Sequence, residues 1–237
     1  MSSRAAFILG ISLILAAVVV AVTYYDVHRF EGTIVATGSA RMAVTSDSVV
    51  WNGGFSRVAP SSLVRQGYDA MRHDAEVVTA FFKSAGIGPE RYTLDPVSLD
   101  EIYDQNSGAE KRYTLRQTFS VHSPDVAGVT QAAADPKPVL DQGVLFTTYG
   151  LEYYYSKLPE ARVSLLGEAV ADARRRAKEI GDAGGAEVGA LRNASLGPVQ
   201  VLGPQSVEVS GGGAYDTRTV DKDIMVTVRA EFGTVPR

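Results

Sequence analysis

The sequence predicts an α+β fold, in which antiparallel sheets are covered by two long helices and one short helix, preceded by one N-terminal transmembrane helix. Three observations predict it. Segments near both ends of the main body alternate apolar and polar residues, as strands with one buried face do. Two longer segments between them repeat apolar residues at three- and four-residue steps. A separate apolar run opens the chain.

The first part of the main body predicts two strands and a helix. The strands are expected over Thr33–Ala40 and Met42–Val58. A glycine interrupts the motif VATGSA in the first, which indicates a bulge or a close approach of backbones. A helix is expected from Pro60 to about Ala85. Its apolar stripe includes Val64, Tyr68, Met71, Ala75, Val78 and Phe82.

The middle part predicts a hairpin and a short helix. Strand patterns at Tyr92–Asp104 and Lys111–His122 flank a polar turn over Gln105–Glu110. Ser123-Pro124-Asp125 then opens a short helix to about Ala134, because serine and aspartate cap unpaired N–H groups. A brief helical turn over Val139–Gln142 is expected next, and a further strand over Gly143–Ser156.

The longest helical pattern runs from Leu158 to Ala183. Pro159 suits a first helical turn, and Gly184-Gly185 suits the end. The stripe expected to face a sheet consists of Leu166, Ala169, Ala173, Ala177 and Ile180. The opposite, solvent-facing side is expected to carry Asp172, Arg174, Arg175, Lys178 and Glu179.

The last part predicts two strands around a glycine-rich loop. The strands are expected over Val188–Leu202 and Thr219–Phe232, and the loop covers Gly203–Asp216. Three consecutive glycines lie in the loop, but the lysine and the helix of a phosphate-binding loop do not follow. We interpret it as a hairpin tip.

Residues 5–25 contain no charged residue and are expected to span a membrane, since about 20 apolar residues cross the hydrocarbon layer. The length favours an uncleaved anchor over a cleaved signal peptide. The expected organisation is an anchor over residues 1–25, a linker over 26–32 and one domain over 33–237. Arg4 favours a single-pass inner-membrane orientation with the domain in the periplasm.

The composition and the spacing of the histidines and aspartates argue against nucleic-acid binding, thiolate chemistry and a metal site. The net charge of −4 gives no support for nucleic-acid binding, and the absence of cysteine removes thiolate chemistry. His28, His73 and His122 are far apart in the sequence and have no ligand spacing. Asp221 and Asp223 share a strand face, which we interpret as solvated and only secondarily as a cation site. The sequence predicts no catalytic residue, no metal and no cofactor.

Two surfaces remain as candidates for interaction. Four tyrosines, Tyr149, Tyr153, Tyr154 and Tyr155, lie in or next to one predicted strand, which fits either a subunit interface or a core. Arg174, Arg175 and Lys178 form a helix surface that could face a partner, although nearby carboxylates offset the charge. A solvated helix face is the alternative.

Several segments resemble the SIMPL domain of bacterial envelope proteins. They are VATGSA, YTLRQTFSVHSPDV, QGVLF, YYYSKL, EAVADARRRAKEI, VGALRNASLGPVQV and TVDKDIMVTVRAEF. The resemblance covers about Thr33 to Phe232 and includes the DAR-x-RA core at Asp172–Ala177. It implies a periplasmic or outer-membrane-associated protein that self-assembles and is linked to stress defence. No catalytic signature is carried over.

The expected function is therefore that of a non-enzymatic envelope scaffold, anchored in the membrane and assembled as a homo-oligomer. A binding module for a lipid, peptidoglycan or a protein partner is the alternative. It would use the glycine-rich loop and the exposed helix face. A hydrolase or metal-binding enzyme is the third hypothesis.

Overall fold

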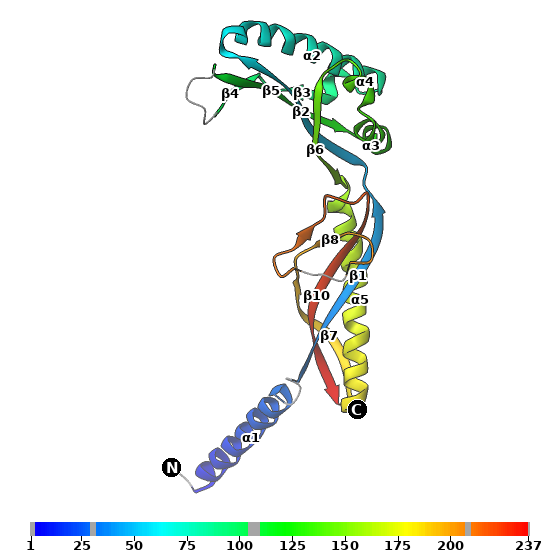
Figure 1. Cartoon of the computed structure of the whole chain (residues 1–237). Coiled ribbons are helices and arrows are strands. Elements are labelled where there is room, and N and C mark those ends of the chain that lie inside the picture. Colours follow the sequence, from blue (N-terminus) through cyan, green and yellow to red (C-terminus); the bar gives the residue numbers. More distant parts are fainter. Residues whose placement is uncertain (1–2, 29–31, 104–109, 207–209, 237) are drawn as a thin grey trace.

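The computed structural model describes residues 3–28, 32–103, 110–206 and 210–236, and its main body forms an elongated molecule of two lobes (Figure 1). Each lobe has its own sheet and its own hydrophobic core. Lobe A contains helix α5 and strands β1, β7, β8, β9 and β10. Lobe B contains strands β2 to β6 and helices α2, α3 and α4. The predicted α+β class is confirmed.

The sheet of lobe A is built around its longest strand, β10 (Asp221–Pro236). Strand β1 (Thr33–Thr45) pairs with it antiparallel over its whole length. On the other side lie β7 (Ala186–Leu196) and β8 (Gln200–Leu202). The single strand expected over this region is thus two strands. The short β9 (Ala214–Tyr215) pairs parallel with β8, so this sheet is mixed and not purely antiparallel.

Helix α5 (Leu158–Gly184) covers one face of this sheet. The expected stripe was partly wrong, because Leu166 and Ile180 are 38% and 52% exposed. The helix follows a strict four-residue step, which keeps small residues against the sheet. The buried residues are Ala161, Leu165, Ala169, Ala173, Ala177 and Gly181. Gly185 ends the helix in the left-handed conformation, with φ of 74°, as predicted.

Gly38 in β1 is the point of closest approach between sheet and helix. A Cβ atom at this position would collide with the carbonyl oxygen of Ala169 and the backbone nitrogen of Ala173. The strand pairing is regular here, so the predicted close approach is confirmed and the predicted bulge is absent. Asp172 does not face water freely as expected. Its carboxylate accepts a hydrogen bond from the N–H of Ser39 at 3.0 Å, on the free edge of β1.

Lobe B is built around β2 (Ser48–Pro60), which pairs antiparallel with its two neighbours. These neighbours are β5 (Arg112–Ser123) and β6 (Leu145–Tyr154). Two short strands, β3 (Tyr92–Leu94) and β4 (Ser98–Ile102), pair with β5 where one longer strand was expected. The expected turn at 105–110 lies almost wholly outside the described residues.

Helices lie on one face of this sheet: α2 (Val64–Ser84), α3 (Val126–Ala134) and α4 (Lys137–Leu140). The short helix expected after β5 is α3, and the brief helical turn expected over Val139–Gln142 is α4, which begins two residues earlier at Lys137. Two 3-10 turns span Ser61–Leu63 and Pro89–Arg91. The core centres on Trp51. The centroid of its ring lies 5.6 Å from that of Phe82 and 5.2 Å from that of Phe119.

The buried face of α2 includes a charged residue that the apolar pattern missed. Asp74 is fully buried and accepts a hydrogen bond from Nη2 of Arg57 at 2.7 Å. Tyr68, expected in the stripe, is 42% exposed. The ion pair between Arg57 and Asp74 therefore joins the helix to the central strand, where an apolar contact was expected.

A narrow waist joins the lobes through hydrogen bonds. The N–H of Ser46 donates to the carbonyl of Val220 at 2.8 Å, and that of Tyr153 donates to Thr217 at 2.7 Å. Lys222, expected on a solvated strand, is only 1% exposed. Its Nζ donates to the carbonyls of Asp216 and, at 2.7 Å, Thr219. This buried lysine thus holds the loop that reaches the other lobe.

Helix α1 (Ser3–His28) precedes lobe A. It includes residues 26–28, which were expected in the linker, while residues 29–31 lie outside the described part. A search of the described residues finds no helix with the length and apolar character needed to cross a membrane. The predicted anchor stays a prediction.

Candidate functional sites

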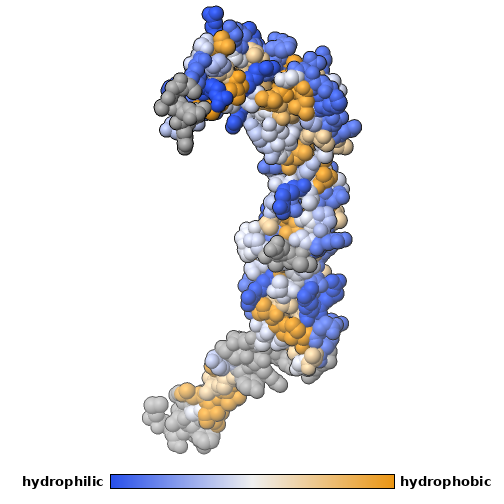
Figure 2. Space-filling model, in the orientation of Figure 1, coloured by the Kyte–Doolittle hydropathy of each residue, from blue (hydrophilic) through white to orange (hydrophobic). Residues whose placement is uncertain are grey.

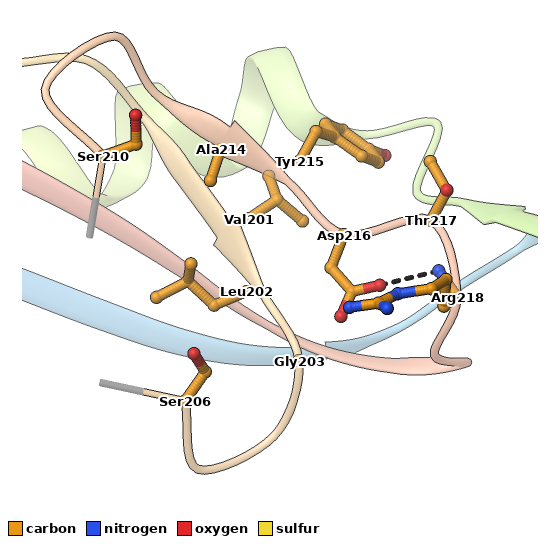
Figure 3. A pocket seen from close by; sticks show the side chains of 10 residues that line it. All are labelled: Val201, Leu202, Gly203, Ser206, Ser210, Ala214, Tyr215, Asp216, Thr217 and Arg218. Atoms are coloured by element: carbon orange, nitrogen blue, oxygen red, sulfur yellow. Dashed lines mark hydrogen bonds between the residues drawn. The ribbon is translucent and has the colours of Figure 1, made fainter. Parts of the chain in front are cut away.

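The glycine-rich loop of lobe A borders an open cavity of about 550 Å³ (Figure 3). Residues of β8, β9 and the loops around them line it: Val201, Leu202, Gly203, Ser206, Ser210, Ala214, Tyr215, Asp216, Thr217 and Arg218. Residues 207–209 lie outside the described part. Asp216 accepts a hydrogen bond from the backbone N–H of Arg218 at 2.6 Å. The wall thus holds one carboxylate and several hydroxyl groups.

Side chains outside the loop hold it in place. Gln200, only 3% exposed, donates from its amide nitrogen to the carbonyl of Ser210 at 2.6 Å. Its amide oxygen accepts from the N–H of the same residue at 3.3 Å. Arg41 donates to the carbonyl of Ser206 at 3.4 Å. The hairpin tip, expected to be flexible, is therefore held at two points. The sequence does not predict these contacts, because they depend on how the loop folds back onto β8 and β1.

A second hollow, of about 620 Å³, lies between α5 and β7. We call it the α5–β7 groove. Its lining consists of Ala171, Arg174, Arg175, Lys178, Asp182, Glu187 and Val188. The three cationic residues predicted as a partner-facing helix surface are all among them. Arg174 lies over the ring of Phe232, 5.8 Å from its centroid, and Arg175 pairs with Asp172 at 2.9 Å.

The four tyrosines lie in different environments. Tyr149 is 53% exposed, whereas Tyr153 is 7% exposed in the core of lobe B, with its hydroxyl 3.1 Å from that of Thr130. Tyr153 therefore fits the core alternative. Tyr154 lies at the waist, where its ring centroid is 5.8 Å from that of Tyr215. The backbone N–H of Tyr155 donates a hydrogen bond to the hydroxyl of Tyr215.

Two pKa shifts follow from these surroundings. The hydrogen bond from Tyr154 to Glu152 raises the pKa of that tyrosine, and burial adds to the effect. Burial also lowers the pKa of the Lys222 ammonium. Its Nζ lies 5.8 Å from the ring centroid of Tyr215. Both groups belong to the waist.

The aspartates singled out in the sequence have structural partners. Asp221 accepts a hydrogen bond from Thr45 at 2.9 Å, and Asp223 pairs with Arg41 at 3.5 Å. Asp125 accepts from the N–H of Gly128 at 2.9 Å, which is the helix start that the sequence predicted.

The histidines are also separate. Nε2 of His122 lies 3.2 Å from the hydroxyl of Ser120, and His73 is exposed on α2. The surroundings of His28 lie outside the described side chains. Within the described residues, no three potential metal ligands come together.

Comparison with known families decides the assignment. The SIMPL family, described as a protein of unknown function (DUF541), matches residues 34–232. The chain belongs to the SIMPL family. The resemblance noted in the sequence is thus confirmed over nearly the whole main body.

Other comparisons add little to the SIMPL assignment. A comparison with curated proteins finds no match. One solved structure, a candidate aminohydrolase from methicillin-resistant Staphylococcus aureus, is 17% identical with a TM-score of 0.23. The match covers 59% of this chain but only 38% of that protein. So low a score carries no argument about fold or activity.

Two of the segments that resemble the SIMPL domain contact one another in the structure. Gly38 and Ser39 of VATGSA contact Ala173 and Asp172 of the DAR-x-RA core. The glycine lets the helix approach, and the aspartate binds the strand edge beside it. These two segments therefore stabilise lobe A.

Proposed function

We propose that this SIMPL protein is a non-enzymatic envelope protein that assembles with copies of itself. The observation that supports the proposal is the open face of the lobe B sheet, opposite its helices. Strands that bury one face usually present polar residues on the other. Here the other face carries exposed apolar side chains: Val58 at 54%, Leu145 at 62% and Tyr149 at 53%.

Strand register brings these side chains together. Leu145 pairs with Ser56, two residues from Val58 on the same face of β2. Tyr149 lies at the irregularity in the β6 pairing, and its hydroxyl lies over Gly54 on this face. Exposed tyrosine and aliphatic groups on one surface are typical of interfaces. A second copy of the chain is the occupant we propose.

The location is part of the same proposal. Residues 5–25 contain no charged residue, and we propose that they anchor the protein in the inner membrane, with the lobes in the periplasm. A role in stress defence is a further proposal and rests on the SIMPL family resemblance alone.

The mass of the full-length protein in detergent, beside that of residues 26–237 without detergent, tests the assembly. We expect discrete complexes for both. Tyr149→Ser and Val58→Ser should reduce the mass, while Tyr68→Ser, which changes a tyrosine on α2 that is 42% exposed, should not. Two monomeric samples would refute the proposal.

A binding module is the second candidate function, and the α5–β7 groove is the observation that favours it. The groove collects three cationic side chains in one ligand-sized hollow. The clamped loop cavity also has a suitable size. Pull-downs with and without residues 203–216 separate a loop-dependent partner from self-assembly.

A further inference from the structure

The α5–β7 groove lies near the end of lobe A that follows the proposed anchor. Thr33 pairs with Gly233, and Ala186 pairs with Pro236. The start of β1, the start of β7 and the end of β10 therefore lie together (Figure 1). Helix α5 ends at Gly184, directly before β7. The starts of β1 and β7 and the ends of β10 and α5 thus form one end surface of lobe A.

Chain length keeps this surface close to the membrane if residues 5–25 are anchored. Thr33 follows Tyr25 by eight positions. Eight extended residues span at most about 28 Å, and a less extended linker spans less. Lys178 precedes the end of α5 by six residues, or about 9 Å of helix. The groove is therefore within reach of lipid headgroups.

The groove presents both signs of charge beside apolar surface. Arg174, Arg175 and Lys178 are exposed cations, and Asp182 and Glu187 are carboxylates in the same lining. Guanidinium and ammonium groups bind phosphate, while carboxylates bind a primary ammonium. Leu191, 44% exposed, pairs in the sheet with Phe232, over whose ring Arg174 lies. Figure 2 shows hydrophobic residues beside hydrophilic ones towards this end of the lobe.

We propose that the α5–β7 groove binds the headgroup of a phospholipid that carries both a phosphate and a primary amine, of which phosphatidylethanolamine is the simplest. The phosphate would contact Arg174 and Lys178, and the amine would contact the carboxylates. Mixed charge fits a zwitterion better than an anion, because a purely anionic headgroup would meet Asp182 and Glu187. The inference rests on the proposed anchor and adds a lipid ligand to it.

A fluorescence experiment on the full-length protein tests the site. The chain has no cysteine, so Ala183→Cys on the exposed end of α5 accepts an environment-sensitive dye at one position. The labelled protein is reconstituted into nanodiscs of phosphatidylcholine, with or without phosphatidylethanolamine. We expect a blue shift when the ethanolamine lipid is present. Lys178→Gln and the double variant Arg174→Gln/Lys178→Gln should abolish the shift.

Matched controls separate the groove from general effects. Arg162→Gln changes an exposed arginine at the other end of α5 and should leave the shift intact. Inorganic phosphate added to phosphatidylcholine discs should cause no shift. An equal shift in all discs, a shift that requires phosphatidylglycerol instead, or a shift that survives Lys178→Gln in a protein with unchanged melting would overturn the assignment.

The same samples distinguish this inference from the proposed function. Retention of the chain in the discs reports the anchor, and the mass of the particles reports assembly. A retained monomer that shows the expected shift would refute assembly but support the lipid site. A retained oligomer without the shift would refute the lipid site alone.

Discussion

At the scale of single residues, backbone contact decides which side chains lobe A can tolerate. Gly38 is surrounded by backbone atoms of α5, which cannot move aside as a flexible side chain would. Ala169 and Ala173 on the helix are fully buried for the same reason, because larger side chains would separate helix and sheet. Small residues on both surfaces therefore form one contact.

Gly38→Ala should lower the free energy of unfolding by about 1–3 kcal/mol, the usual cost of forcing extra atoms into a packed core. Gly150→Ala is the matched control, since a Cβ in that strand meets nothing within 4 Å. Urea unfolding of both variants measures the difference. Equal midpoints would contradict the close contact.

Asp172 should make the protein sensitive to acid. The hydrogen bond from the Ser39 N–H, followed by those from Arg175 and Arg176, lowers the pKa of Asp172 from 3.8 to about 2. The unfolded chain therefore binds this proton more readily than the folded one. The stabilisation is present above pH 3.8 and is lost as the pH falls towards 2.

Asp172→Asn should flatten the dependence of stability on pH between about 4 and 2, because the group that titrates there is gone. Asp69→Asn removes an exposed carboxylate that pairs with Arg72 at 2.9 Å, and it should keep the acid dependence. Chemical unfolding at a series of pH values measures both. A variant curve parallel to the wild type would contradict the role of Asp172.

At the scale of elements, local patterns predicted most helices and strands, but not their partners. Capping and periodicity placed α5 close to its observed bounds, whereas β1 ends at Thr45 instead of Ala40 and β2 begins at Ser48 instead of Met42. The burial of Asp74 could not be predicted, because it depends on Arg57 on another element. The burial of Lys222 could not be predicted either, because it depends on the carbonyls of a loop. The three cations of the α5–β7 groove were recognised in the sequence, but the hollow beside them depends on where β7 lies.

The loop of lobe A should depend on Gln200. This buried amide forms two hydrogen bonds with Ser210, as a neighbouring strand would. Gln200→Ala should speed amide hydrogen exchange in residues 210–215, since exchange follows local opening. Gln131→Ala, at an exposed position of α3, should leave exchange there unchanged. Unaltered exchange in the first variant would show that other contacts hold the loop.

At the scale of the whole molecule, the waist sets how the lobes lie relative to one another. Val220 packs against the core of lobe B although its strand neighbours belong to lobe A. Lys222 holds the loop from which Thr217 and Val220 reach the other lobe. The two cores could not be distinguished in the sequence, because β1 and β2 follow each other with only two residues between them.

Lys222→Met should broaden the distribution of distances between the lobes, because the loop loses its two carbonyl contacts. Spin labels at Arg72→Cys on α2 and Arg162→Cys on α5 measure that distribution in a chain without other cysteines. Lys178→Met, an exposed lysine on the same lobe, is the control. Identical distributions in all three proteins would exclude a clamp at Lys222.

The position of the chain's single tryptophan has an optical consequence. Trp51 is fully buried in lobe B, and lobe A has none. Intrinsic fluorescence excited at the indole band therefore reports the melting of one lobe, while far-ultraviolet circular dichroism reports both. Heating curves that coincide would mean that the waist transmits unfolding from one core to the other. Curves that separate would give each lobe its own stability, without any label or truncation.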